Sequence, residues 1–276
     1  MRQFVLEKKP DSKGLITIDG KDFKYIRQVL RLKAGDMIKV SSFGKSYSAT
    51  LASIDDSKKI ITLQLCDTQT EPKESGAAPS DRPEFWLLQF IPKPQKMELI
   101  IRQAVECGVS KIIPVVGEYS QDRGERRERI ERIIREARQQ SGSPVETEVL
   151  EAMSLESALE LIKERREQAL NDKKASVCIS LYERNQNSVS VHEAVSRAVN
   201  DAESCATSAD AKIDFAICAV GCEGGISPSE ITLLKDAGFS TVHLDVNILR
   251  CETASLYGMA VLQTTILENK KWQLKE

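Results

Sequence analysis

The sequence predicts an α/β protein with a small β-rich domain over residues 1–70, a linker over 71–84 and a larger domain over 85–276. The first stretch alternates short strand patterns with turns. Residues 67–84 are rich in Pro, Ser, Glu and Gly and lack apolar periodicity, which is typical of a linker. Beyond them, short continuous apolar runs alternate with helical patterns, as in a parallel sheet covered by helices.

The first domain is predicted to be a small β-barrel with one helix. Apolar residues recur at helical spacing over residues 22–30. The expected strands cover residues 3–6, 15–18, 37–41, 46–54 and 60–66.

Basic residues outnumber acidic ones in this domain, with 13 Lys and Arg against 8 Asp and Glu over residues 1–70, whereas the whole chain has a net charge of −2. A basic module on an acidic protein can supply a face that contacts phosphates. Each basic residue taken alone is equally well explained as a solvated surface group. The candidates for RNA contact here are Arg2, Lys24, Arg27, Arg31, Lys33 and Lys45.

The second domain begins with a β-α-β pattern. A strand over residues 85–91 precedes a helix over 97–107 and a strand over 111–116, and such short connections are typical of parallel sheets. Lys93 and Lys96 follow the first strand, either as RNA contacts or as solvated residues at the start of a helix.

Further along the chain, charged and amphipathic patterns predict helices over 123–140 and 155–169, followed by a strand over 175–181. The end of that strand, Leu181 with the two residues after it, is a candidate wall of a ligand pocket. Residues 185–212 are polar, with a weak helical pattern over 191–202, and we expect a surface excursion there.

The stretch 213–254 carries the clearest site signal. An apolar strand ends in a loop containing Gly221, Gly224 and Gly225, which permit positive φ and close approach of a ligand. Ser227 and the proline after it predict the start of a helix. A second strand over 241–244 is followed by a second loop, and the carboxyl ends of strands in open α/β sheets are where ligands bind. Neither dinucleotide-binding nor P-loop glycine patterns occur.

Composition limits the possible functions. The chain has 276 residues, 41% of them hydrophobic and 29% charged, as in ordinary soluble proteins. The N-terminus lacks the apolar core of a signal peptide, and no apolar run reaches the ~18 residues that span a membrane. Seven cysteines, scattered and odd in number, indicate reduced thiols and a cytoplasmic location. Two histidines without a C-x-x-C pair favour neither a metal site nor a thiol nucleophile.

Two motifs resemble a known family. The segments G-C-E-G-G (221–225), with Ser227 and Glu230, and I-L-R-C-E-T-A (248–254) resemble the G-P-E-G-G…E and I-L-R-x-E-T-A signatures of the ribosomal RNA small subunit methyltransferase E family. That family belongs to the SPOUT superfamily of S-adenosylmethionine-dependent RNA methyltransferases. The resemblance implies a SPOUT-type parallel sheet with a trefoil knot. It also implies a PUA-like RNA-binding barrel, since residues 25–36 are similar to the family's H-x-x-x-V-L-R-x-x-x-G-D segment.

The resemblance further implies an activity and a set of site residues. The expected reaction is transfer of a methyl group from S-adenosylmethionine to N3 of a uridine in 16S rRNA, carried out by a homodimer. Arg250 and Glu252 are expected to orient the substrate and compensate charge, although a structural Arg–Glu pair bracing the last helix is an alternative. The resemblance does not identify the residue that acts as the general base. The expected cofactor-binding residues are Leu181, Gly221, Cys222, Glu223, Gly224, Gly225, Leu244, Asp245, Ile248, Leu249 and Thr253.

Three residues depart from the family pattern and leave alternatives open. Cys222 replaces a proline, Asp245 a glycine and Asn247 an arginine. If Asp245 and Asn247 abolish catalysis, the chain is an RNA-binding or ribosome-assembly factor on the same scaffold. A related enzyme acting on transfer RNA is the other alternative, because fold analogy does not fix the substrate.

Overall fold

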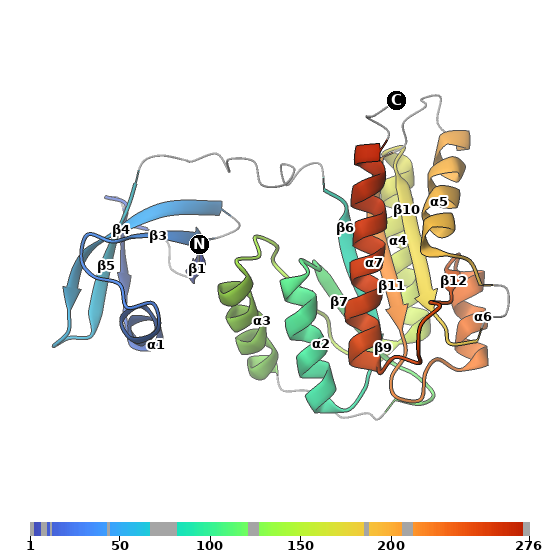
Figure 1. Cartoon of the computed structure of the whole chain (residues 1–276), viewed down its shortest axis with the longest axis horizontal. Coiled ribbons are helices and arrows are strands. Elements are labelled where there is room, and N and C mark those ends of the chain that lie inside the picture. The colour runs from blue at the N-terminus through green and yellow to red at the C-terminus, as the bar shows by residue number, and fades with distance from the viewer. Residues whose placement is uncertain are drawn as a thin grey trace. The chain divides into compact units, whose positions relative to one another are not determined.

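The computed structural model describes residues 3–6, 10–11, 13–42, 45–66, 82–120, 127–184, 188–205 and 212–272. The chain divides into two compact units, one of Met1–Ser80 with Arg135–Glu146 and one of Asp81–Ile134 with Thr147–Glu276. Most of the predicted linker over residues 71–84 lies outside the described residues, so the domain boundaries stay a prediction. The labelled elements of each unit are shown in Figure 1.

The first unit contains a five-stranded sheet in the order β1-β3-β4-β5-β2, and the five strands are those predicted. Strands β1 and β3 are parallel, and the other pairs are antiparallel. Among the described residues no pairing joins β1 to β2, so closure into a barrel stays a prediction. The strands are β1 (Gln3–Leu6), β2 (Leu15–Ile18), β3 (Met37–Ser42), β4 (Lys45–Asp55) and β5 (Ile60–Leu65).

The predicted helix of this unit is present in two parts. Helix α1 (Gly20–Lys24) continues directly into a π-helical turn, η1 (Tyr25–Val29). Phe23 and Ile26 lie three residues apart, so both fall on the same face, and both are buried against the sheet residues of this unit's core. The two buried side chains thereby anchor the helix and the π-helical turn to the sheet, which sets where the chain continues after Val29.

The second unit is organised around a parallel sheet in the order β12-β10-β11-β6-β7-β8, with β9 also paired to β7. The apolar runs in the sequence form its central strands, which are almost completely buried because helices cover both faces. Its strands are β6 (Glu84–Phe90), β7 (Lys111–Val116), β8 (Glu148–Val149), β9 (Met153–Ser154), β10 (Ala175–Leu181), β11 (Ile213–Val220) and β12 (Ser240–Val242).

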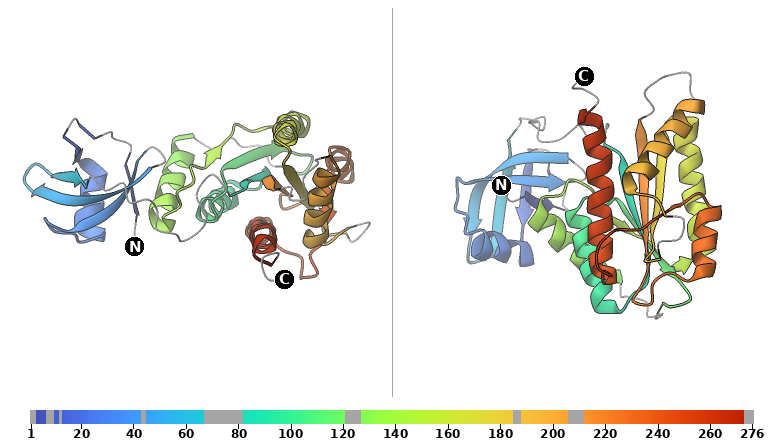
Figure 2. Two further views of the ribbon diagram at one scale, coloured as in Figure 1. Left: turned by 90° about the horizontal axis from the view of Figure 1, so that it is seen from above. Right: turned by 45° about the vertical axis from the view of Figure 1, so that its right-hand side comes forward.

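Helices cover the two faces of this sheet unequally (Figure 2). Helices α2, α5 and α7 lie together on one face, while α4 and α6 cover the other. The helices of the chain beyond residue 90 are α2 (Pro94–Glu106), α3 (Arg127–Ser141), α4 (Leu155–Asn171), α5 (Val191–Cys205), α6 (Pro228–Asp236) and α7 (Cys251–Trp272).

Helix α5 corrects one expectation. The polar stretch over residues 185–212 suggested a surface excursion, but α5 buries Val191, Ala194 and Val195 and packs on β10 and α7. The helical periodicity was present in the sequence. The many polar residues of this stretch lie on the solvent-facing side of α5, which is an amphipathic helix.

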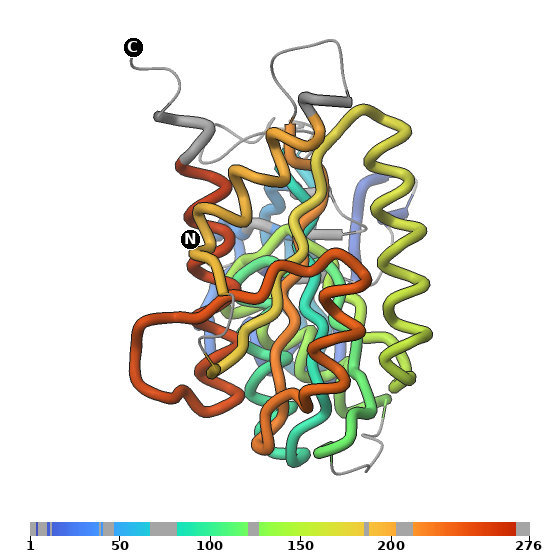
Figure 3. Tube along the Cα trace, turned by 90° about the vertical axis from the view of Figure 1, so that its right-hand side faces the viewer, coloured from blue at the N-terminus to red at the C-terminus, as the bar shows by residue number. Residues whose placement is uncertain are grey.

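The order of the strands determines where a ligand can bind. Strands β12, β10 and β11 are adjacent and parallel, so their carboxyl ends, Val242, Leu181 and Val220, lie at one edge of the sheet. Figure 3 shows the segment between β12 and α7 as a wide loop at this edge. Three loops therefore meet there: the two that carry the glycine and I-L-R motifs, and the loop after β10, whose first residues were predicted as a further wall of the pocket. The trefoil knot stays a prediction.

Candidate active site

The loop after β11, residues 221–227, is a tight turn that requires glycine at two positions. The Gly225 N–H donates to the Cys222 carbonyl oxygen at 3.0 Å, and Gly225 has a φ of +79°, in the left-handed region. A Cβ atom at Gly221 would lie 2.6 Å from the Gly225 carbonyl carbon. The turn therefore depends on both glycines, as the sequence predicted.

Glu230 fastens this loop to two other segments. Its Oε2 accepts the Ser227 N–H at 2.8 Å, and its own N–H donates to Ser227 Oγ at 3.3 Å, which completes a capping box at the start of α6. Its Oε1 accepts the Glu118 N–H at 2.7 Å. Both carboxylate oxygens of Glu230 thus accept backbone hydrogen bonds, and they join the glycine loop to the segment after β7.

Cys222 holds the position that is a proline in the family pattern, and the structure gives it a structural role. Its thiol is buried and donates to the Tyr119 carbonyl oxygen at 3.2 Å. Burial is the main cause that raises the pKa of this thiol. A protonated thiol that fastens the loop to Tyr119 replaces the rigidity of a proline and is a poor nucleophile.

The loop over residues 243–250 is the most exposed part of the site. The side chain of Ile248 is 85% exposed, and Val246 is exposed too. His243 Nδ1 lies 3.3 Å from the Tyr182 carbonyl oxygen, so the start of this loop is tied to the segment after β10. The rest of the loop is open to solvent and presents apolar side chains at the rim of the site.

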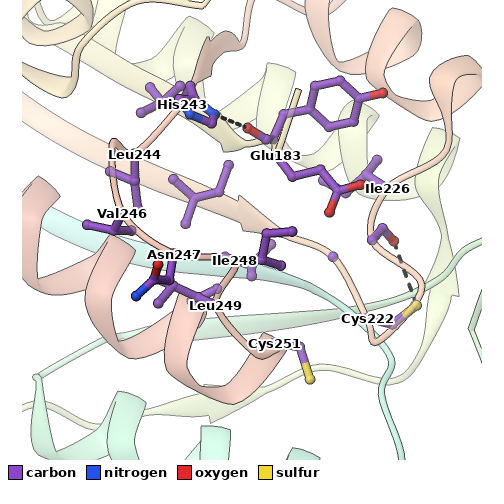
Figure 4. A pocket seen from close by; sticks show the side chains of 17 residues that line it. Glu183, Cys222, Ile226, His243, Leu244, Val246, Asn247, Ile248, Leu249 and Cys251 are labelled. Carbon is purple, nitrogen blue, oxygen red and sulfur yellow. Dashed lines mark hydrogen bonds between the residues drawn. The ribbon is translucent and has the colours of Figure 1, made fainter. Parts of the chain in front are cut away.

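A cavity lies between these three loops and encloses about 740 Å³, part of it open to solvent (Figure 4). Seven predicted cofactor-binding residues line it: Leu181, Gly221, Cys222, Gly225, Leu244, Ile248 and Leu249. Four predicted ones do not: Glu223, Gly224, Asp245 and Thr253. Those four are exposed; three of them lie in the loops, and Thr253 lies in the first turn of α7.

Ten further residues line the cavity without having been predicted as cofactor-binding residues. Five of them had a sequence signal: Tyr182 and Glu183 directly follow the strand end at Leu181, Cys251 and Ala254 belong to the I-L-R-C-E-T-A motif, and Asn247 is a departure from the family pattern. The complete set of additional lining residues is Tyr182, Glu183, Val220, Ile226, Val242, His243, Val246, Asn247, Cys251 and Ala254.

The lining suits a ligand with apolar and cationic parts, such as S-adenosylmethionine. Val220, Ile226 and Leu249 supply apolar walls, and the glycine backbone supplies N–H and C=O groups that can pair with an adenine edge. Glu183 is the only carboxylate among the lining residues, and the lining contains no Lys or Arg. A sulfonium or ammonium group would therefore meet a complementary charge here.

Beside the cavity, an ion-pair cluster joins the two loops. Lys96, in the first turn of α2, places its Nζ 3.5 Å from Glu223 Oε1 and 3.3 Å from Glu252 Oε2. Cys251, which lines the cavity, donates its thiol to Glu252 Oε2 at 3.2 Å. Lys96, predicted to contact RNA, is thus engaged by two carboxylates, and Glu252, predicted to be catalytic, lies against it.

The titration of this cluster is shifted by its own contacts. Burial by itself would raise the pKa of Glu252, but hydrogen bonds from its own N–H, from the Cys251 thiol and from Lys96 lower it. Burial first, and Glu252 next, raise the pKa of the Cys251 thiol to about 12. At neutral pH the cluster therefore contains one ammonium, two carboxylates and a neutral thiol, a net charge of about −1.

Arg250 does not form the alternative structural pair with Glu252. It is exposed, and within the described parts of the chain it takes part in no ion pair, whereas Glu252 pairs with Lys96. Lys93 is exposed at the N-cap of α2, and its backbone N–H donates to Glu223 Oε1 at 3.2 Å. Lys93 and Arg250 are thus two exposed cations that lie close in sequence to members of the cluster, Lys93 to Lys96 and Arg250 to Cys251.

The predicted RNA-binding residues of the first unit differ in their availability. Lys24, Arg31 and Lys33 are exposed. Arg27 is held by Asp56, with Nε and Nη2 at 3.1 and 2.9 Å from its two carboxylate oxygens, and also donates to the Leu32 carbonyl oxygen. Arg2 lies outside the described residues. Arg31 has a positive φ of 55°, a conformation that is strained for a non-glycine residue.

Gln89, near the end of β6, is a buried polar residue of the site that was not predicted. Its Nε2 donates to the carbonyl oxygens of Phe90, Val220 and Gly221 at 2.9, 3.3 and 3.2 Å, and its Oε1 accepts from Ser255 Oγ at 2.6 Å. It therefore links β6, the glycine loop and α7. The only sequence feature that could have indicated its role was the presence of one polar residue inside an apolar strand.

In the described part of the chain, no group of three or more His, Cys, Asp and Glu residues is placed to hold a metal ion. None of the described helices is long and apolar enough to span a membrane.

Comparisons with known proteins agree with this architecture. The model of an RNA methyltransferase domain matches residues 79–263, and that of an RNA methyltransferase PUA domain matches residues 18–64. The curated ribosomal RNA small subunit methyltransferase E of Rickettsia conorii is 27% identical over 86% of this chain and 84% of its own length. The Bacillus subtilis protein of the same name is 26% identical over 91% of both chains.

Solved structures show the same fold. The ribosomal RNA small subunit methyltransferase E of Neisseria gonorrhoeae, bound to S-adenosyl methionine, superposes with a TM-score of 0.72 at 22% identity and covers 96% of this chain and 97% of that one. A probable rRNA methyltransferase from Porphyromonas gingivalis also superposes with a TM-score of 0.72, at 23% identity, over 98% of this chain and 100% of that one. With the family model matched over most of its length, and with the sheet and the cavity-lining loops described above, this chain belongs to the RNA methyltransferase family.

Proposed function

We propose that this protein transfers a methyl group from S-adenosylmethionine to N3 of a uridine in 16S rRNA of the small ribosomal subunit. The observation that carries the proposal is the meeting of three loops, after β10, β11 and β12, around one cavity that has a carboxylate and no cation. The names of the curated relatives support a ribosomal substrate.

The cofactor brings an already activated methyl group, so the protein has to bind, orient and exclude water. The backbone at Gly221 and Gly225 would form the wall closest to the ligand's polar edges, and Leu249 and Ile226 provide apolar walls. Glu183 would face a positively charged part of the cofactor. Exposed Val246 and Ile248 stand at the rim, where they can cover a bound ligand.

The finer parts of the proposal concern assembly and location. We propose a cytoplasmic homodimer with a trefoil knot in the second unit and an RNA-binding first unit. Exposed apolar side chains on the first turns of α7, Leu256 and Tyr257, together with Val246 and Ile248, support a self-associating surface near the cavity. Exposed Lys24, Arg31 and Lys33 support phosphate contact by the first unit.

Calorimetric titration with S-adenosylmethionine tests the cavity. We expect saturable binding, and much weaker binding of ATP, which shares the adenosine but carries negative charge into a cavity with a carboxylate. Lack of binding of S-adenosylmethionine to folded protein would overturn the proposal.

Transfer of a labelled methyl group tests the substrate. Small ribosomal subunits and total transfer RNA are offered separately, and the product is located by mass mapping. Methylation of uridine N3 in 16S rRNA is expected. Labelling of transfer RNA alone would favour the related transfer-RNA enzyme, and RNA binding without transfer would favour the assembly factor.

A further inference from the structure

The cluster of Lys96, Glu223, Glu252 and Cys251 has an arrangement that loop bracing alone does not account for. Lysine in the first turn of a helix is locally unfavourable, because the positive end of the helix dipole lies there. Lys96 occupies this position in α2, which has no acidic residue in its first turn. Local rules are broken most often at functional sites, where other parts of the fold compensate for them.

The cluster also has one carboxylate more than its ammonium neutralises. Glu223 is fixed by a backbone group, since its Oε1 accepts the Lys93 N–H as well as Lys96 Nζ. Glu252 accepts from its own backbone N–H and, at Oε2, from two side chains, Lys96 and the thiol of Cys251. Unlike Glu223, it is not held by the backbone of another segment, and its two side-chain partners can turn away. Glu252 is therefore the member that can more easily present an oxygen to a proton.

Glu252 lies beside the cavity in which the cofactor is proposed to bind. It directly follows Cys251, which lines the cavity, and its side chain is 15% exposed, so solvent can reach it. The exposed Arg250 and Lys93 flank the cluster in sequence and can hold RNA phosphates on either side of it. An acceptor base held there would enter beside Glu252.

Resting on the proposed function, we propose that Glu252 accepts the N3 proton of the target uracil and that Lys96 is the residue that positions Glu252. The N3–H bond breaks and its proton moves to the Glu252 carboxylate. The electron pair left on N3 forms the bond to the methyl carbon, while the bond from sulfur to that carbon breaks and leaves its electrons on sulfur. Glu252 then releases the proton to water.

The groups that face Glu252 set its pH dependence. They are Lys96 from α2, Cys251 from its own helix and Glu223 from the glycine loop. Lys96 helps to lower the pKa of Glu252, so the wild-type rate should fall only in acid. Lys96→Met removes that cation and should move the acid limb of the pH–rate profile to higher pH, whereas Lys96→Arg should move it back.

The test is single-turnover methyl transfer to small ribosomal subunits, with cofactor affinity measured separately by calorimetry. Glu252→Gln should lower the transfer rate by at least about 100-fold, the usual effect of a general base, with cofactor affinity unchanged. Its residual rate should rise with hydroxide concentration up to the pKa of uracil N3–H. The control is Glu193→Gln, which removes another first-turn carboxylate, paired with Arg197 on α5, and should leave the rate unchanged.

Each outcome decides the proposal. A Glu252→Gln protein within threefold (about 0.7 kcal/mol) of the wild-type rate overturns it. A slow variant that keeps the wild-type pH profile shows a structural role and also overturns it. If the wild-type protein binds the cofactor but methylates no RNA, the proposed function itself fails, which the wild-type measurement reveals before any variant is made.

Discussion

Replacing Gln89 by leucine removes the polar group that connects β6, the glycine loop and α7. Gln89 is completely buried, so water is unavailable to replace its hydrogen bonds. Ser255 keeps a partner, because its hydroxyl also lies 2.8 Å from the Cys251 carbonyl oxygen. The carbonyl oxygens of Phe90, Val220 and Gly221 lose the Gln89 amide as a donor, and Gly221 forms part of the cavity wall.

The size of the effect follows from these lost bonds. A buried polar group left without its partner costs about 1–3 kcal/mol, so losing the two N–H donors of the amide predicts a decrease of about 2–6 kcal/mol in the free energy of unfolding. Since the glycine loop would be held less firmly, cofactor affinity should fall about tenfold, which corresponds to about 1.4 kcal/mol.

Urea unfolding measures the first quantity and calorimetric titration with S-adenosylmethionine the second. Gln263→Leu is the matched control, because Gln263 is also a nearly buried glutamine that donates to a backbone carbonyl, that of Cys107 at 2.9 Å, but it does not line the cavity. The control should lose stability and keep its cofactor affinity. Equal cofactor affinity in Gln89→Leu and wild-type protein would refute the assigned role of Gln89.

Three further predictions concern the turn, the helices and the first unit. Gly221→Ala places a Cβ 2.6 Å from the Gly225 carbonyl carbon and should weaken cofactor binding at least about tenfold, while Gly35→Ala, in the first unit, should not. The Arg129 guanidinium lowers the pKa of Glu98. The stability that this ion pair contributes is therefore present above about pH 4.5 and is lost as the pH falls through the lowered pKa of Glu98. The free energy of unfolding of Glu98→Gln in urea should differ from that of wild type at neutral pH and converge with it in acid. Arg31→Ala should reduce the salt dependence of RNA binding by about one phosphate contact, whereas Arg27→Ala should chiefly lower the melting temperature, because Asp56 loses its partner.

Much of the second unit could be predicted because its strands are buried on both faces. Runs such as residues 215–220 are continuously apolar only in that environment, and Ser227 with Glu230 marks the start of α6. The glycine turn followed from the same local chemistry. The β12 strand ends at Val242, two residues earlier than predicted, because local pattern does not fix strand ends.

Partners from distant segments were the part that sequence patterns did not reveal. Lys96 and Glu252 are 156 positions apart, and only the packing of α2 against α7 brings them together. The same holds for Gln89 and Ser255. A polar residue in an apolar strand indicates that a buried partner exists, but the identity of that partner depends on tertiary structure.

The three departures from the family pattern do not have equal weight. Cys222 keeps the glycine loop fastened through Tyr119, and Asp245 is exposed and does not line the cavity, so neither residue obstructs a ligand there. Asn247 does line it, and an amide in place of a guanidinium removes a positive charge from the cavity wall. That change increases the preference for a cationic ligand, because Glu183 then has no competing partner in the lining. The hypothesis of lost catalysis therefore rests on Asn247 alone, and the charge of the cavity argues against it.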